Sequence, residues 1–300
     1  MTRNIRIAVV GYGNVGKHAK EAILAAPDME LAGIIRREGA KDQPGDTIFI
    51  DEDTDIKTLG HVDVALLCKP TRQVEEYATR YLSQGIHTVD SFDIHGKITD
   101  LRQNLGTVAV RGKSVAVIAS GWDPGSDSVV RTLLEAAAPV GITYTNFGPG
   151  LSMGHSVVAR SKDGVADALS ITIPLGTGVH RRMVYVQLED NADIAEVTKH
   201  IKEDKYFSND ELHVISVPDV SVLADMGHGV HLTRKGRSGT TDNQLFTFEM
   251  RIHNPALTSQ IMVSCARAAT RQKPGAYTMM ELPLIDLLPG TREEIIGRLC

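Results

Sequence analysis

The chain has 300 residues, a length that suits two domains, and 42% of them are hydrophobic, which is enough for packed cores. Its formal net charge of −5 comes from charges of both signs, so it shows no basic excess that would attract nucleic acid or an anionic membrane. The three cysteines, Cys68, Cys265 and Cys300, are too far apart to predict a disulfide framework or a metal site, and they fit a reducing compartment. We expect a cytoplasmic protein, because the sequence has no signal-peptide pattern and no run of roughly 18 apolar residues.

Near the start, the apolar run 5–10 leads into Gly11-Tyr12-Gly13-Asn14-Val15-Gly16, and a helical stretch follows at 17–26. A strand, G-x-G-x-x-G and a helix in this order form the fingerprint of a dinucleotide site. Gly11 allows the tight turn, Gly13 lets the backbone approach a pyrophosphate, and Gly16 lets the helix pack closely on the strand. The free amide groups of the helix N-terminus favour phosphate, so these six residues are predicted to bind a cofactor.

The second predicted strand ends at Arg36 and Arg37, where an NAD-selective site would usually place an acidic residue for the ribose 2′-hydroxyl. Two guanidinium groups suit a 2′-phosphate, which they can bind through charge-assisted hydrogen bonds. The pair therefore favours NADP over NAD. A solvated basic pair is the alternative, and Glu38 is left open as a ligand of a ribose hydroxyl.

Strand and helix patterns alternate over the first 120 residues, which predicts a parallel sheet covered by helices. Several strand runs are continuously apolar, as is typical of strands buried on both faces. Strands are expected at 5–10, 30–35, 62–68, 86–90 and 114–119, and helices at 15–26, 72–84 and 97–111. The segment 39–60 is predicted to be irregular, with one short strand at 47–50.

After Trp122-Asp123-Pro124-Gly125 the pattern changes to long alternating runs, which predict an open mixed or antiparallel sheet with one covered face. Strands are expected at 142–147, 169–174, 182–189, 212–217, 230–234 and 244–253, and helices at 126–138, 192–203, 256–272 and 292–299. The predicted fold is α/β: a Rossmann dinucleotide-binding domain at 1–122, completed by 255–300, and an α+β substrate-binding domain at 123–254. Such open sheets often form dimer interfaces, so we expect a homodimer.

Ligands of open α/β sheets bind beyond the carboxyl ends of the strands. Four residues that follow the third strand are expected to contact the cofactor: Cys68, Lys69, Pro70 and Thr71. The next two strands are followed by Asp90 and Asp93, and by Trp122 and Asp123. One aspartate alone could be a helix cap or a turn residue, but three at one edge favour a substrate with a positive amino group.

The second domain offers groups of the opposite sign, suited to a carboxylate. Arg182 opens a strand beside Arg181, and Thr172 lies on another strand. His228 lies between two glycines and Asn254 precedes a proline, so these two could instead be a turn residue and a helix cap. The glycine-rich run 147–155 is expected to be a loop, either one whose N–H groups bind a carboxylate or an ordinary connection.

Five motifs together resemble the meso-diaminopimelate dehydrogenase family. They are Val9–Gly16, Thr88–His95, Ser120–Gly125, Phe147–Ser156 and Asp225–Gly229. The resemblance runs along the whole chain, which is similar to the shorter form of the family because the region between Pro174 and Arg182 is compact.

This resemblance implies an NADP-dependent, reversible oxidative deamination. The D centre of meso-2,6-diaminopimelate would give L-2-amino-6-oxopimelate, which cyclises to tetrahydrodipicolinate, with release of ammonia, in lysine and peptidoglycan-precursor biosynthesis. Other D-amino acids are possible further substrates. By matching motif, Asp93, Trp122, Asp123, Met153 and Gly154 resemble the contacts around the reacting D centre, and Phe147, Thr172, Arg182, His228 and Asn254 resemble those around the distal L centre. Arg181 could replace Arg182 as the anchor.

Asp123 is the preferred candidate for a general base, before Asp93, with His155 as a further candidate. A second possibility is another NADP reductase of the same architecture, either like dihydrodipicolinate reductase or a semialdehyde dehydrogenase with a cysteine nucleophile such as Cys68. A third is a dinucleotide sensor without catalysis. Trp122 and the charged candidates of both domains argue against a sensor.

Overall fold

The computed structural model describes residues 3–37, 47–207, 211–223 and 227–300, which form two compact units. The first unit comprises the chain up to Val130 together with Pro255–Cys300, and the second comprises Arg131–Asn254. The first boundary lies later than residue 122 because helix α4 (Ser126–Ala137) runs across it. Within these ranges, no helix is both long and apolar enough to cross a lipid bilayer.

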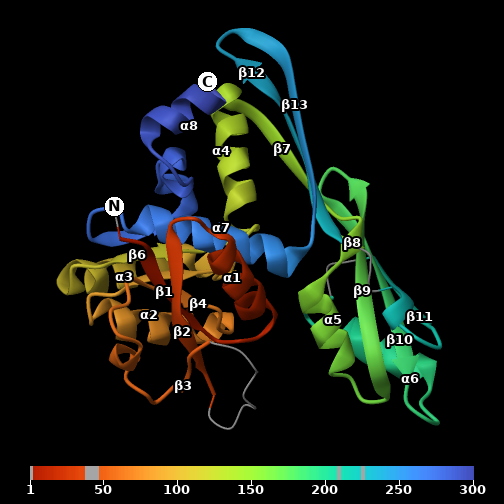
Figure 1. Ribbon diagram of the computed structural model, residues 1–300. Coiled ribbons are helices and arrows are strands. Elements are labelled where there is room, and N and C mark those ends of the chain that lie inside the picture. Colours follow the sequence, from red (N-terminus) through yellow and green to blue (C-terminus); the bar gives the residue numbers. More distant parts are fainter. Residues whose placement is uncertain (1–2, 38–46, 208–210, 224–226) are drawn as a thin grey trace. The chain divides into compact units, whose positions relative to one another are not determined.

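The first unit is built on a seven-stranded sheet, counted over the described residues, in the order β14-β6-β5-β4-β1-β2-β3 (Figure 1). Its strands are β1 (Ile5–Val10), β2 (Met29–Arg36), β3 (Phe49–Asp51), β4 (Val64–Leu67), β5 (His87–Asp90), β6 (Val115–Ile118) and β14 (Gly275–Thr278). All neighbouring strands are parallel. The chain adds β2 and β3 on one side of β1 and then β4, β5 and β6 on the other. Doubly wound sheets bind ligands where the strand order reverses in this way, which here is at the β1–α1 turn.

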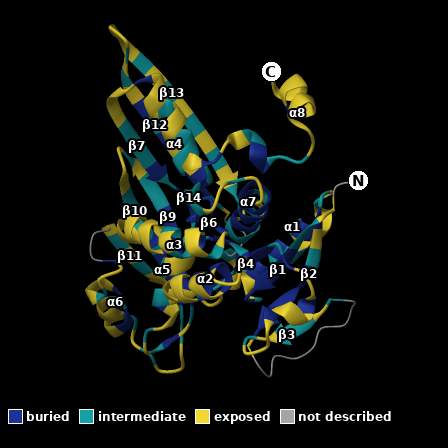
Figure 2. Cartoon of the chain, turned by 90° about the vertical axis from the view of Figure 1, so that its left-hand side faces the viewer, coloured by how far each residue is buried: buried dark blue, intermediate teal, exposed yellow. Residues whose placement is uncertain are grey.

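Strand β1 shows why both faces of this sheet are covered. Ile7 and Val9 belong to the hydrophobic cluster that includes α1 (Asn14–Ala25) and α7 (Asn254–Ala269). Ala8 and Val10 belong to the cluster that includes α2 (Val74–Leu82) and α3 (Ile98–Gly112). Figure 2 shows the result as buried strands with exposed residues on the outer sides of α2 and α3. The predicted helices and strands of this half are confirmed, and the last helix, α8, spans Arg292–Leu299.

The second unit has two sheets rather than the single open sheet that was expected. One has the order β11-β10-β9-β8 and carries helices α5 and α6 on one face, and the other has the order β13-β12-β7. The strands are β7 (Val140–Phe147), β8 (Gly150–Leu151), β9 (Val165–Gly176), β10 (Val179–Leu188), β11 (Glu211–Ser216), β12 (His228–Ser238) and β13 (Thr241–Ile252), and the helices are α5 (Met153–Arg160) and α6 (Ile194–Glu203). Only β10 and β11 run parallel among these described strands.

Two local expectations differ from the structure, and one predicted strand is found with shifted bounds. The expected loop at 147–155 contains β8 and the start of α5, which packs on β9 where Ser156 Oγ accepts the amide of Ser170 at 2.9 Å. His228 begins strand β12 rather than occupying a turn, and the short strand expected at 47–50 is β3. Glu38, Asp225 and Met226 lie outside the described residues.

Candidate active site

The turn between β1 and α1 needs glycine at two positions for different reasons. Gly11 has φ +99°, and a Cβ atom there would lie 2.3 Å from the carbonyl oxygen of Cys68. A Cβ atom on Gly16 would lie 2.1 Å from the carbonyl oxygen of Gly11, so α1 packs against the turn only with glycine at this position. Gly13 differs, because its Cβ position has no heavy atom within 4 Å and faces open space.

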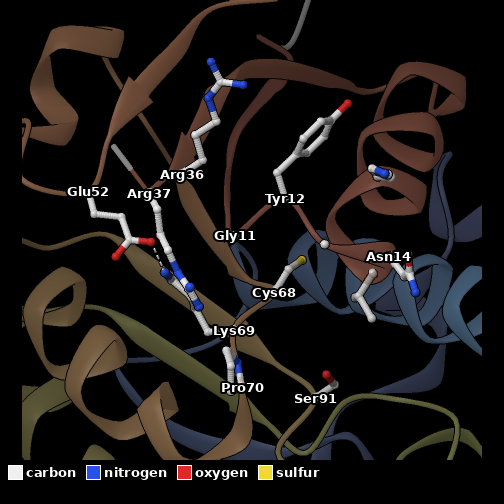
Figure 3. Close-up of a pocket in the computed structure, with 13 residues that line it drawn as sticks. Gly11, Tyr12, Asn14, Arg36, Arg37, Glu52, Cys68, Lys69, Pro70 and Ser91 are labelled. Atoms are coloured by element: carbon white, nitrogen blue, oxygen red, sulfur yellow. Dashed lines mark hydrogen bonds and ion pairs between the residues drawn. The ribbon is translucent and has the colours of Figure 1, made fainter. Parts of the chain in front are cut away.

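Around this turn lies a cavity of about 660 Å³ (Figure 3). Its lining includes ten of the residues predicted from the fingerprint, the arginine pair and the end of β4: Gly11, Tyr12, Gly13, Asn14, Val15, Arg36, Arg37, Cys68, Lys69 and Pro70. Ser91, which follows β5, also lines the cavity and was not predicted to contact the cofactor, whereas Gly16 and Thr71 were predicted and do not line it. Lys17 and Glu52 also line it and were missed.

The side chain of Arg36 is held by aromatic packing at the edge of this cavity. Its guanidinium lies 4.2 Å from the ring centre of Phe49, and Tyr12 packs edge-on against the same ring at 5.4 Å. Stacking of this kind restrains the guanidinium plane without using its hydrogen-bond donors. Arg36 therefore presents a fixed positive group beside the more exposed Arg37.

Glu52 and Lys69 form an ion pair in the same cavity. The hydroxyl of Tyr77 also donates to Glu52 Oε2 at 2.5 Å, and Lys69 Nζ lies 4.5 Å from the Tyr77 ring centre. Burial opposes ionisation of Glu52, but the hydrogen bonds from Lys69 and Tyr77 outweigh it, so the pKa of Glu52 lies below its usual value. Glu52 directly follows β3, so a strand prediction one residue longer would have placed it among the strand-end candidates.

Cys68 is poorly suited to act as a nucleophile. Burial raises the pKa of its thiol to about 12, so the thiolate is scarce at neutral pH. This environment disfavours the thioester chemistry of a semialdehyde dehydrogenase at Cys68.

The acidic candidates at the ends of β5 and β6 have different surroundings. Asp93 is exposed and accepts a hydrogen bond from Thr71 Oγ1 at 2.5 Å. Asp90 is fully buried and binds backbone amides, so its placement differs from the substrate contact expected from the sequence. Trp122 is buried, and its carbonyl oxygen accepts the amide of Asp127 in the first turn of α4. Asp123, the next residue, has a buried Oδ1 atom.

In the second unit, strand pairing separates the two adjacent arginines. Arg182 pairs with Thr172 across β10 and β9, and its Nη1 donates to Thr172 Oγ1. Arg181 Nε instead donates to Glu211 Oε1 at 2.7 Å in an exposed ion pair. Because neighbouring strand residues point to opposite faces, Arg182 and Arg181 cannot serve the same site, and the structure groups Arg182 with Thr172.

The other candidates of the second unit are distributed over several elements. Phe147 ends β7, and its amide donates to His180 Nε2 at 2.8 Å. His228 starts β12, next to β7 in the sheet, and Asn254 is the first residue of α7. Gly148 follows Phe147. The amide of Gly148 donates to the Gly229 carbonyl at 2.8 Å and so joins the end of β7 to the start of β12.

Met153 and Gly154 are the first residues of α5, and Tyr206 lies against Gly154. A Cβ atom on Gly154 would lie 2.5 Å from the Tyr206 hydroxyl, a contact that sequence reasoning missed because it joins distant segments. His155 packs edge-on against Tyr206 and Phe207 at 4.6 and 5.1 Å, and its Nδ1 lies 2.9 Å from Ser152 Oγ. These contacts give His155 a packing role.

Two family models match separate parts of the chain. Residues 5–90 match the model of the oxidoreductase family with an NAD-binding Rossmann fold, and residues 121–179 match the diaminopimelic acid dehydrogenase C-terminal domain. The chain is 60% identical to the meso-diaminopimelate D-dehydrogenase of Bacteroides fragilis, over 99% of each chain. It is 33% identical to the enzyme of that name from Lysinibacillus sphaericus, over 97% of this chain and 98% of the other.

Solved structures give the same result. The C. glutamicum DAP dehydrogenase in complex with DAP matches with a TM-score of 0.89 and 30% identity, over 100% of each chain. An engineered D-amino acid dehydrogenase bound to NADP⁺ matches with a TM-score of 0.83 and 29% identity, over 99% of this chain and 100% of that one. With similarity along the full length in both sequence and structure, the chain belongs to the meso-diaminopimelate D-dehydrogenase family.

Proposed function

We propose that this protein catalyses the reversible, NADP-dependent oxidative deamination of the D centre of meso-2,6-diaminopimelate. The products are L-2-amino-6-oxopimelate, which cyclises to tetrahydrodipicolinate, ammonia and NADPH. The observation that carries the proposal is the 60% identity over 99% of the chain to the Bacteroides fragilis enzyme of that name. The reaction belongs to lysine and peptidoglycan-precursor biosynthesis, and the protein acts in the cytoplasm.

The cavity at the β1–α1 turn fits a dinucleotide. The open space at Gly13 leaves room for a pyrophosphate, and the amides that begin α1 face no acidic residue in its first turn. Arg36 and Arg37 would hold the 2′-phosphate, and the stacked position of Arg36 on Phe49 supports that role. When bound, NADP⁺ supplies a hydride acceptor.

NADP selectivity can be tested at the arginine pair. Replacing both Arg36 and Arg37 by alanine should weaken NADP⁺ binding by about 100-fold, or about 2.7 kcal/mol, and change NAD⁺ binding little. Equal losses for both cofactors would contradict a 2′-phosphate site at this pair.

Two groups of residues bind the two ends of the substrate. Asp93 and Asp123 bind and orient the ammonium group of the D centre, beside the indole of Trp122, while Met153 and Gly154 contribute to the same end. Arg182 and Thr172, already joined by a hydrogen bond, hold the distal carboxylate with Phe147, His228 and Asn254. Fixing both ends leaves one Cα–H of the D centre free to react.

The amine must lose a proton before the D centre can give up hydride. Asp123 is the base candidate, because it follows Trp122 on the loop after β6 and its Oδ1 atom is buried there, whereas Asp93 is exposed. The Asp123→Asn variant should lose kcat and the acidic limb of the pH profile. An increase of KM alone would instead assign Asp123 to binding.

We also propose a homodimer that forms through the sheet β13-β12-β7. Ile142 and Leu245 both pair with Lys235, so they share one face of this sheet, and Val140 lies two residues from Ile142 on that face. Val140, Ile142 and Leu245 are all exposed in the single chain. Exposed apolar side chains on both sides of Lys235 on one sheet face support a contact between subunits.

The first experiment measures the initial rate of NADPH formation at alkaline pH. Meso-diaminopimelate is compared with the LL isomer, D-alanine and D-lysine. Oxidation of the meso isomer with little activity on the LL isomer supports both the reaction and its selectivity for the D centre. Tight NADP⁺ binding without oxidation of any of these compounds would refute the proposed reaction and favour a dinucleotide sensor.

A further inference from the structure

Asp90 links two loops that follow neighbouring strands of the first unit. Its side chain is fully buried, and Oδ1 accepts the amide of Phe92 at 2.9 Å and the amide of Ala119 at 3.0 Å. Its backbone carbonyl accepts the amide of Ser120 at 2.8 Å. One residue thus makes three hydrogen bonds, of which two cross from the end of β5 to the loop after β6.

These bonds begin where the sheet ladder stops. Strands β5 and β6 pair at Thr88 with Ala116 and at Val89 with Val117, and the pairing ends before Asp90. Ala119 then has φ +52°, a left-handed conformation that is unfavourable for a residue with a Cβ atom. The hydrogen bond from its amide to Asp90 Oδ1 therefore stabilises a backbone turn that the ladder no longer supports.

Each of the two loops carries groups that we assign to the D centre. Phe92 directly precedes Asp93, and the loop that starts at Ala119 leads to Trp122 and Asp123. Since these groups come from separate loops, the distance between them depends on what joins the loops. In the described structure, Asp90 supplies two hydrogen bonds between them.

Burial of the Asp90 carboxyl group carries a cost in free energy. Its second oxygen, Oδ2, is buried and has no hydrogen-bond partner among the described residues. Burial raises the pKa of Asp90 to about 6, and the buried thiol of Cys265 lies within its electrostatic range. Burying a carboxyl group with an unpaired oxygen lowers the stability of the fold. Hydrogen bonds to a carboxylate are about twice as strong as those between neutral groups. A costly group that binds both loops strongly favours a function in fixing the loops.

We propose that Asp90 is a positioning residue that sets the spacing between Asp93 and the Trp122–Asp123 pair, and so controls capture of the D-centre amine. It does not touch the substrate. Neither Asp90 nor the loop after β6 lines the dinucleotide cavity, and only Ser91 of the linked loops does, so we expect cofactor binding to change less than substrate binding when the link is lost. The inference rests on the proposed function for its substrate, but its structural part can be measured separately.

The test compares Asp90→Ala with Asp90→Asn, which retains an oxygen acceptor for both amides. Thr88→Val is the matched control, because Thr88 is equally buried on the same strand and its hydroxyl has no hydrogen-bond partner among the described residues. Trp122 is the only tryptophan in the sequence, so intrinsic emission reports directly on the second loop. The measurements are this emission, the Kd for NADP⁺, and kcat and KM for meso-diaminopimelate.

In Asp90→Ala we expect KM for meso-diaminopimelate to rise at least about tenfold while the Kd for NADP⁺ changes less than about twofold. The Trp122 emission should shift to longer wavelength, Asp90→Asn should restore most of KM and emission, and Thr88→Val should resemble the wild type. Unchanged KM and emission in Asp90→Ala, or equal changes in Thr88→Val, would overturn the proposal.

The test also applies if a variant does not fold or if the wild type is inactive. If Asp90→Ala does not fold, Asp90→Ser replaces it with the same expected results. If the wild type does not oxidise meso-diaminopimelate, the proposed function fails, while the emission of Trp122 in the same variants still supports or refutes the link between the loops.

Discussion

Gly13 and Gly16 form a matched pair of test positions, because they belong to one turn but a side chain would meet different surroundings. A Cβ atom on Gly16 would lie 2.1 Å from the Gly11 carbonyl oxygen, well under the 3.0 Å that real Cβ contacts keep. The clashing atom belongs to the backbone and cannot rotate away. On Gly13 the same atom would have no heavy-atom neighbour within 4 Å. Alanine should therefore affect stability at one position and cofactor binding at the other.

The size of each effect follows from these contacts. Overpacking costs about 1–3 kcal/mol, and because the turn cannot relax around Gly11, we expect about 3 kcal/mol for Gly16→Ala, which lowers Tm by about 6–12 °C. Gly13 is the N-cap of α1, with extended angles of φ −79° and ψ −159° that alanine also adopts. Since alanine is a poorer N-cap than glycine, Gly13→Ala should lose at most about 1 kcal/mol of stability.

Binding shows the reverse pattern. A methyl group on Gly13 occupies the space through which the pyrophosphate would approach, so the Kd for NADP⁺ should rise at least about 30-fold, or about 2 kcal/mol. Denaturant unfolding without cofactor measures stability, and titration of the folded protein with NADP⁺ measures Kd. Gly13→Ala with a Kd within about threefold of the wild type would refute the close approach. Wild-type stability in Gly16→Ala would refute the packing argument.

Three further predictions concern other parts of the chain. Arg182→Ala should raise KM for meso-diaminopimelate about 100-fold, whereas its neighbour variant Arg181→Ala should change KM less than about threefold; similar losses in both would contradict the assignment of the anchor. Hydrogen bonds from Arg267 hold the pKa of Asp28 below its usual value of 3.8, so this carboxylate stabilises the fold above pH 3.8 and the contribution is lost as pH falls through the folded pKa. In Asp28→Asn, the acid-unfolding curve should be flatter below about pH 4, and an unchanged curve would reject this linkage. Leu245→Lys should convert the dimer to monomers at micromolar concentration in light scattering, whereas an intact dimer would exclude this sheet as the interface.

The sequence predicted the first unit well because its signals are local. Continuous apolar runs such as β4 (Val64–Leu67) are buried on both faces, and the glycine fingerprint requires a strand before it and a helix after it. The need for glycine at positions 11 and 16 could also be predicted from the sequence, because the motif itself specifies the turn.

The second unit was harder to predict because its decisive contacts are distant in sequence. Gly154 argues against a helix by propensity, yet it lies in α5, where a Cβ atom would meet the Tyr206 hydroxyl and a larger residue would require Tyr206 to shift. Strand-end aspartates also look alike in sequence, although Asp90 is buried and Asp93 is exposed. Which carboxylate faces inward depends on the pleat and on the amides of the following loop.

The return of the chain to its first unit has a consequence during translation. Strand β14 pairs with β6, and residues of α7 such as Met262 and Ala266 complete the cluster beneath β1. A nascent chain that has emerged only as far as the second unit therefore exposes the edge of β6 and the part of one sheet face that α7 later covers beside α1. Unpaired edges of this kind promote aggregation, so we expect the growing polypeptide to depend on chaperones or on ribosome proximity until its last 50 or so residues are made.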